Sequence, residues 1–187
     1  DMFGNGLSSS PSNSSSPQDG PRFPDLTLWD NIYCQHKLLT EKLKIKKIVL
    51  VTGWSMAGCQ AYQWAAQFPD MVKSILPFCA SAKTSMHNHV FLEGVKAALI
   101  ADKNWNNGDY KSPPAAGLKA FGRVYAGWAF SQDFFREELY KKIGFKTAED
   151  LLKDWENDHV KNWDANNLLT KIDTWQTANV GAGPIYN

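Results

Sequence analysis

Apolar residues form short continuous runs in the first half of the chain. Residues 48–53, IVLVTG, and residues 74–80, SILPFCA, have the length and the apolar content of buried strands. Between them, residues 58–68 carry apolar side chains at helical spacing, and Pro69 ends this pattern. Two apolar strands joined by a helix predict a parallel sheet that is covered by helices.

A further helix is predicted before the first strand. Thr27 can cap a helix over residues 27–43, with Asp30 in the position of the usual Glu or Gln. The preceding residues 1–24 are dense in Gly, Ser, Asn and Pro, a composition typical of a flexible linker. Their place just upstream of a helix indicates instead an ordered loop near a site, and both interpretations stay open.

From residue 81 onward, helical periodicity replaces the strand pattern. Helices are predicted over residues 91–101, 116–130, 134–143, 148–155 and 164–177. We therefore expect a partial α/β core over residues 1–83 and a mostly helical cap over residues 84–187. The chain begins without Met, in a Gly-rich turn of the kind that follows a strand, and it ends in loop-like sequence. We expect it to be an internal part of a larger domain.

The turn after the first predicted strand carries the best candidate for chemistry. Ser55 lies in GWSMAG, between strand and helix, where a nucleophile elbow would place its Oγ above the sheet edge. Gly53 and Ala57 are small enough for the helix to pass the strand, although Ala57 stands where Gly is usual. The backbone N–H of Met56 would lie at a helix N-terminus and could stabilise an oxyanion. The alternative is a solvated turn or a helix cap.

Composition and charge narrow the function classes. The 187 residues are 43% hydrophobic, with a net charge of +1 and no signal for nucleic acid binding. The apolar runs are too short to span a bilayer, so no membrane partner is expected. Three cysteines have no metal-like spacing and are typical of a reduced, intracellular protein. We expect a cytoplasmic protein without a metal, and an enzyme if Ser55 is a nucleophile.

Several segments together resemble the homoserine O-acetyltransferase family of α/β-hydrolase-fold enzymes and its uncharacterised relatives. Gln35 and Leu38, which follow the FPDLTLWDN segment, take part in the match. The other matching segments are GNGLSSSPSN, GWSMAG, QWAAQFPDMV and WDANNLL. These span nearly the whole chain in the family's order. The chain resembles the middle of that family's domain, without its N-terminal and C-terminal regions.

The resemblance implies an α/β-hydrolase fold with an inserted helical cap and a double-displacement reaction. Ser55 would accept the acyl group of acyl-coenzyme A, as acetyl-coenzyme A, and pass it to the hydroxyl group of a small-molecule substrate. No bound cofactor is implied. The triad Asp and His would come from C-terminal loops outside this chain. The partners that we expect are therefore the missing N- and C-terminal segments, on flanking sequence or on a separate chain, and a second copy in a homodimer.

Two further residues are candidates for substrate binding. Arg123 is a lone charge among apolar and aromatic residues, and the family places an Arg in this part of its cap to hold a substrate carboxylate. A surface ion pair is the alternative for Arg123. Trp54 stands beside the nucleophile, where biosynthetic members have a small residue. Its bulk would either narrow the acyl pocket or pack against the cap.

Other functions remain open on the sequence alone. A serine esterase of the same fold would use water as the acyl acceptor. A non-catalytic relative with a binding or structural role would keep the turn at Ser55 only because it packs the helix against the strand. None of the four histidines receives a catalytic role, because the acid normally lies between Ser and His along the chain. These histidines are His36, His87, His89 and His159.

Overall fold

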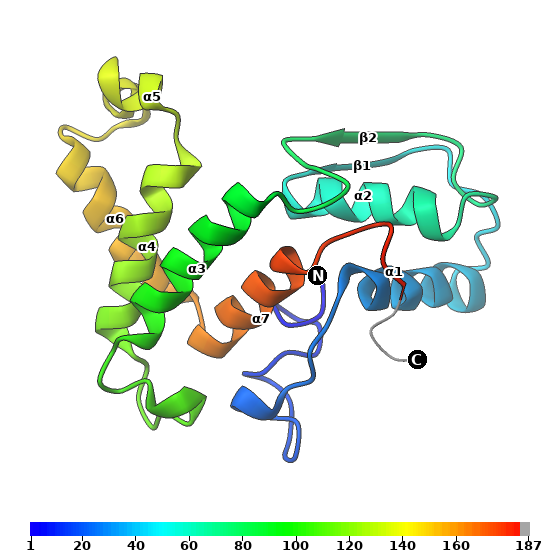
Figure 1. Cartoon of the computed structure of the whole chain (residues 1–187), viewed down its shortest axis with the longest axis horizontal. Coiled ribbons are helices and arrows are strands. Elements are labelled where there is room, and N and C mark those ends of the chain that lie inside the picture. The colour runs from blue at the N-terminus through cyan, green and yellow to red at the C-terminus, as the bar shows by residue number, and fades with distance from the viewer. Residues whose placement is uncertain (184–187) are drawn as a thin grey trace. The chain divides into compact units, whose positions relative to one another are not determined.

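A computed structural model describes residues 1–183 and groups them into two compact units (Figure 1). Unit 1 comprises Asp1–Ser9, Pro24–His89 and the residues from Thr170 onward. Unit 2 comprises Ser10–Phe23 and Val90–Leu169. The sequence-based division between core and cap at residue 83 stays a prediction.

The sheet of unit 1 is a parallel pair of strands, as predicted. β1 (Val51–Trp54) pairs with β2 (Ile75–Phe78), with Val51 opposite Ile75 and Trp54 opposite Phe78. α2 (Met56–Gln67) connects the strands and packs along one face of both (Figure 1). The opposite face carries the exposed side chains of alternate residues, which are Thr52, Trp54, Leu76 and Phe78.

α1 (Leu28–Lys37) packs against α2 and begins where the sequence predicts. Thr27 and Asp30 form a reciprocal capping box at its first turn. Ile32 of α1 is fully buried in a cluster with Trp64 and Met71. After α1 the chain widens into a π-helical turn, η2 (Leu38–Lys42), rather than continuing as a regular helix to residue 43.

The N-terminal segment of unit 1 is held against α7 (Ala165–Gln176), whose second half belongs to this unit. The ammonium group of Lys171 donates to the carbonyl of Phe3 at 2.8 Å. The N–H of Phe3 donates to the buried side chain of Asn31 at 2.9 Å. Met2 packs on a cluster of buried residues, which are Leu28, Cys59 and Ala178.

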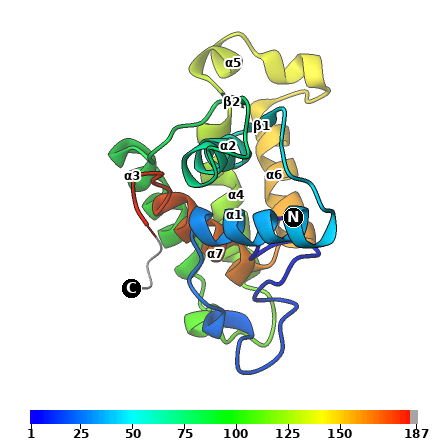
Figure 2. The same ribbon diagram turned by 90° about the vertical axis from the view of Figure 1, so that its right-hand side faces the viewer.

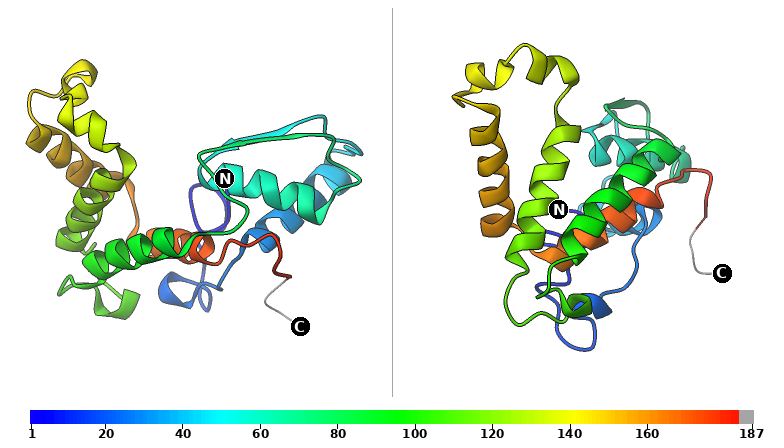
Figure 3. Two further views of the ribbon diagram at one scale, coloured as in Figure 1. Left: turned by 45° about the horizontal axis from the view of Figure 1, so that its top comes forward. Right: turned by 60° about the vertical axis from the view of Figure 1, so that its left-hand side comes forward.

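Unit 2 is helical, as the periodicity predicts. α4 (Ala115–Ala129) and α6 (Ala148–Asn162) run side by side (Figures 2 and 3). The space between them is narrow, since a Cβ on Gly122 would lie 2.8 Å from the carbonyl of Trp155. The other elements wholly in this unit are η1 (Gly20–Arg22), η3 (Asn106–Gly108), α5 (Gln132–Arg136) and η4 (Leu139–Ile143). α3 (Met86–Ile100) begins in unit 1 and continues in unit 2.

Two predicted helix boundaries in unit 2 were wrong. The helix predicted over residues 134–143 is two shorter pieces, because Glu138 adopts a left-handed conformation with a φ of 51°. α6 does not end at Trp155 but continues for two more turns, where His159 is buried and stacks on Trp163.

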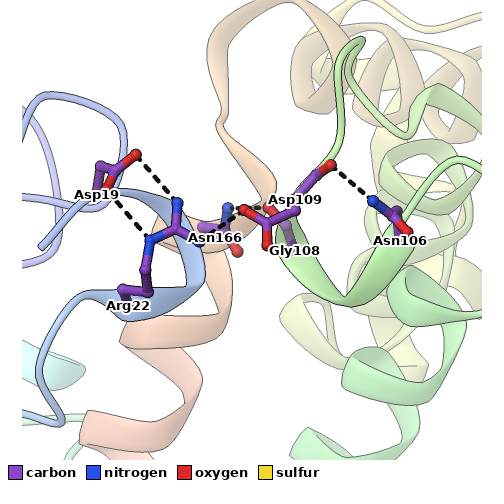
Figure 4. Close-up of polar contacts among 6 residues, drawn as sticks. All are labelled: Asp19, Arg22, Asn106, Gly108, Asp109 and Asn166. Carbon is purple, nitrogen blue, oxygen red and sulfur yellow. Dashed lines mark hydrogen bonds and ion pairs between the residues drawn. The ribbon is translucent and has the colours of Figure 1, made fainter. Parts of the chain in front are cut away.

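The Ser- and Pro-rich loop of unit 2 is ordered by polar contacts (Figure 4). Arg22 forms ion pairs with Asp19 at 3.1 Å and with Asp109 at 2.8 Å. The side-chain amide of Asn166 donates to the carbonyl of Gly108 at 3.0 Å. The structure therefore shows an ordered loop, while its place near a site stays a prediction.

Candidate active site

Ser55 occupies a strained turn between β1 and α2. Its φ of 56° and ψ of −126° place a residue with a Cβ in a region that glycine normally fills. The backbone holds it there from both sides. The N–H of Ser55 donates to the carbonyl of Phe78 at 3.1 Å, and its carbonyl accepts from the N–H of Cys59 at 3.0 Å.

The Ser55 hydroxyl does not cap the helix that follows it. Ser55 precedes the first residue of α2, where a capping side chain would accept a hydrogen bond from the helix backbone. A cap was the main alternative to a nucleophile at this position. The strained turn together with the uncapped helix is the geometry that a nucleophile elbow requires.

Glycines on both sides of Ser55 allow the helix to lie against the strands. A Cβ on Gly53 would lie 2.4 Å from the carbonyl carbon and oxygen of Ala57. A Cβ on Gly58 would lie 2.5 Å from the Cβ of Ala80 and 2.9 Å from the carbonyl oxygen of Gly53. Real Cβ atoms do not approach so closely, so both positions need glycine. Ala57 itself is exposed, which explains why a methyl group is tolerated there.

Met56 is the first residue of α2. Its N–H therefore has no carbonyl within the helix to which it could donate a hydrogen bond. The positive end of the helix dipole adds to the field at this N–H. An oxyanion that forms on a carbonyl attacked by Ser55 would be stabilised there. The oxyanion role of Met56 stays a prediction.

Trp54 lies directly before Ser55 on the face of the sheet opposite α2. Its side chain is 66% exposed, and its ring centre lies 6.3 Å from that of Phe78 on the neighbouring strand. Both aromatic rings stand at the carboxyl end of the sheet, the end that carries Ser55. A ligand that reaches Ser55 over this face would meet Trp54, but its role in substrate binding stays a prediction.

Arg123 is engaged in an ion-pair network between α4 and α6. Its guanidinium donates to both carboxylate oxygens of Glu149, at 3.0 and 2.8 Å, and its Nε donates to Glu156. These hydrogen bonds lower the pKa of the Glu149 carboxyl below its usual value. The structure therefore shows the ion-pair alternative. A substrate carboxylate would have to displace Glu149, and this binding role stays a prediction.

The histidines lie in three different settings. His36 stacks on Phe68 with ring centres 3.8 Å apart, and His159 is buried with its Nδ1 2.8 Å from the carbonyl of Trp155. His87 and His89 lie in the first turn of α3. That the triad Asp and His lie outside this chain stays a prediction.

Within residues 1–183, no group of three or more His, Cys, Asp or Glu side chains is arranged to hold a metal ion. In the same part of the chain, no helix has the length and apolar character needed to cross a bilayer.

One contact at the elbow was missed by the sequence analysis. The carbonyl of Phe78 anchors the N–H of Ser55, so β2 helps to hold the strained turn. The signal was the predicted parallel pairing, because the carboxyl ends of adjacent parallel strands lie side by side.

Comparison with known proteins places nearly the whole described chain in one family. The family model for the alpha/beta hydrolase fold matches residues 1–182. An ethyl acetate hydrolase from Pseudomonas veronii is 35% identical over 181 residues, covering 96% of this chain and 52% of that protein. The solved structure of the acetyl esterase MekB has a TM-score of 0.92 at 35% identity and covers 95% of this chain and 52% of that one.

The predicted resemblance to homoserine O-acetyltransferases is also confirmed. The enzyme of that name from Solidesulfovibrio magneticus is 36% identical over 127 residues, which are 66% of this chain and 32% of that protein. The chain spans about half the length of the esterase relatives named above. It belongs to the α/β-hydrolase fold family.

Proposed function

We propose that Ser55 is the nucleophile of an enzyme that hydrolyses small acyl esters, acetyl esters in particular. The observation that carries this proposal is the strained turn of Ser55 at the carboxyl end of β1, with a hydroxyl that does not cap α2. Likeness to an ethyl acetate hydrolase and to an acetyl esterase over nearly the whole chain supports the choice of substrate class.

The reaction would proceed in two steps. The Oγ of Ser55 attacks the ester carbonyl while a base removes its proton, and the N–H of Met56 stabilises the negative oxygen of the tetrahedral intermediate. The C–O bond then breaks, and the alcohol leaves with the proton. Water attacks the acyl-enzyme in the same manner, which releases the carboxylic acid and restores Ser55.

A second function shares the first half of this mechanism. Acyl-coenzyme A would acylate Ser55, free coenzyme A would leave, and a small hydroxylated acceptor would take the acyl group. Likeness to homoserine O-acetyltransferases over two thirds of the chain favours this acyl transfer. The two functions differ in whether water or the acceptor reaches the acyl-enzyme.

The base and its supporting acid are proposed to come from polypeptide outside residues 1–187. A serine hydroxyl needs a base near neutral pH, and in this fold the order along the chain is Ser, acid, His. The chain spans only about half of its esterase relatives, which leaves room for both groups in the remainder. That remainder, on flanking sequence or a second chain, is the first partner that the site needs.

Steady-state assays on the complete protein separate these functions. Ester hydrolysis is measured as acetate release from ethyl acetate, and transfer as free thiol released from acetyl-coenzyme A with and without a hydroxyl acceptor. Hydrolysis of ethyl acetate that is lost in Ser55→Ala supports the esterase. Thiol release that requires the acceptor and is lost in Ser55→Ala supports the transferase instead.

Ser74→Ala is the matched control, because Ser74 is an exposed serine of the same unit. It should leave both activities unchanged. A protein in which neither substrate reacts would instead be the non-catalytic relative.

A further inference from the structure

Positive charge is concentrated at one edge of unit 1, formed by residues 36–47 and 70–73. We call this surface the basic edge. It carries six lysines and two carboxylates, Glu41 and Asp70, so its net charge is +4, whereas the whole chain carries only +1. The lysines are Lys37, Lys42, Lys44, Lys46, Lys47 and Lys73, and all six are exposed.

Backbone pairing brings the two segments of the basic edge together. Ile48 and Val72 form a parallel bridge, and the N–H of Lys73 donates to the carbonyl of Ile48 at 2.9 Å. The ammonium group of Lys47 donates to the backbone carbonyl of Asp70 at 2.5 Å. Lys44 adopts a φ of 57°, which turns the chain between η2 and β1. The lysines therefore form one surface although two stretches of sequence supply them.

A hollow of about 530 Å³ lies at the centre of the basic edge. Ile45 and Met71 give it apolar lining, and Lys44, Lys46 and Lys47 also line it. An apolar hollow among lysines suits a partner that offers an apolar side chain flanked by negative charges.

The composition of the basic edge favours one class of partner. It contains no Arg for two-pronged phosphate contacts and no Trp, Tyr or Phe on which a base could stack, so it lacks the usual features of a nucleic acid site. A bilayer presents a plane of headgroups, which cannot insert a side chain into a hollow. A peptide segment can fill the hollow and pair with the lysines at once.

We propose that the basic edge binds an acidic polypeptide segment that inserts an apolar side chain into the hollow. The edge lies at the amino-terminal end of β1, and Ser55 lies at the carboxyl end. Ser55 lies seven positions after Ile48, roughly 20 Å along a strand. The surface is therefore separate from the candidate active site, and the proposal does not depend on the proposed function.

Fluorescence anisotropy on the complete protein tests this proposal. The probe is a labelled octapeptide of six glutamates with two central leucines, and a second peptide has glycines in place of the leucines. We expect the leucine peptide to bind, with an affinity that falls as the salt concentration rises. Its affinity should be about tenfold higher than that of the glycine peptide. Equal affinities for the two peptides would overturn the role of the hollow.

Charge reversal locates the surface. Lys44→Glu, Lys46→Glu and Lys47→Glu together should weaken binding by at least about tenfold. The matched control reverses Lys119, Lys142 and Lys146, three exposed lysines of unit 2, and should leave the affinity unchanged. The arginine variants of Lys44, Lys46 and Lys47 keep the charge and should bind, and an unchanged urea unfolding curve of the glutamate variant excludes a folding defect as the cause.

Three results would overturn the proposal. The first is an equal loss of binding in the variant that reverses Lys119, Lys142 and Lys146. The second is no saturable binding of the leucine peptide. The third is binding to phosphatidylserine vesicles or duplex DNA instead of the leucine peptide.

Discussion

Replacing Gly58 by Ala should disrupt the elbow, although alanine normally stabilises a helix. The added Cβ would lie 2.5 Å from the Cβ of Ala80, 2.9 Å from the carbonyl oxygen of Gly53 and 3.3 Å from that of Phe78. Ordinary carbon contacts begin at about 3.5 Å, so the start of α2 must move away from the strands by up to about 1 Å. Two of the three neighbours are backbone atoms that cannot rotate aside.

The magnitude follows from two opposing effects. Ala is favoured over Gly in a helix by about 1 kcal/mol, while overpacking of this kind costs about 1–3 kcal/mol. We expect Gly58→Ala to lower the free energy of unfolding by up to about 2 kcal/mol. A shift of this size would also move the N–H of Met56 relative to Ser55, and kcat/KM should fall by about 10- to 100-fold.

Urea unfolding and ester hydrolysis by the complete protein measure the two effects. Gly94→Ala is the matched control, since Gly94 lies in α3 and a Cβ there would meet nothing within 4 Å. That variant should gain up to about 1 kcal/mol and keep full activity. Equal stability and equal activity of Gly58→Ala and Gly94→Ala would refute the steric role of Gly58.

Three further predictions concern residues away from the elbow. Lys44→Gly should raise the free energy of unfolding by about 1 kcal/mol, because the φ of 57° at this position strains a residue with a Cβ. A lower free energy of unfolding, measured with urea, would contradict this. Burial lowers the pKa of Lys171 to about 8, below the value of 10.5 expected when unfolded. The stability of the wild type relative to Lys171→Met should therefore rise between pH 8 and 10.5, by about 1–2 kcal/mol because the half-buried ammonium group is partly screened by solvent, and a difference that does not change with pH would contradict the burial of this charge. Arg123→Lys loses the two-pronged contact with Glu149 but should change stability by less than about 1 kcal/mol, because the pair is exposed. If Arg123 also binds substrate, this variant raises KM for an acceptor that carries a carboxylate and leaves ethyl acetate hydrolysis unchanged. An unchanged KM would mean that Arg123 only forms the ion pair and does not bind substrate.

Features that depend on local sequence could be predicted. The strand pair, the capping box of Thr27 and Asp30, and the turn at Ser55 each follow from a few adjacent residues, and the structure has all three. The need for small residues at the elbow was also visible, because Gly53 and Ala57 lie two residues before and after Ser55.

Features that depend on residues far apart in the chain were not predicted. Arg123 had no visible partner, because Glu149 and Glu156 are 26 and 33 residues away in sequence. The break at Glu138 interrupts a stretch whose apolar spacing is helical, and no Gly or Pro marks it. The last turns of α6 look polar in sequence, although His159 is buried there against aromatic rings and Gly122. The basic edge likewise forms only when Lys73 pairs with Ile48.

The central claim is that Ser55 forms the acyl-enzyme. The most direct measurement is mass spectrometry of the complete protein after brief reaction with a fluorophosphonate probe, with the modified peptide sequenced. We predict a single adduct on Ser55, which is absent from Ser55→Ala and present in Ser74→Ala. An unmodified Ser55, or an adduct on another residue that persists in Ser55→Ala, would contradict the account.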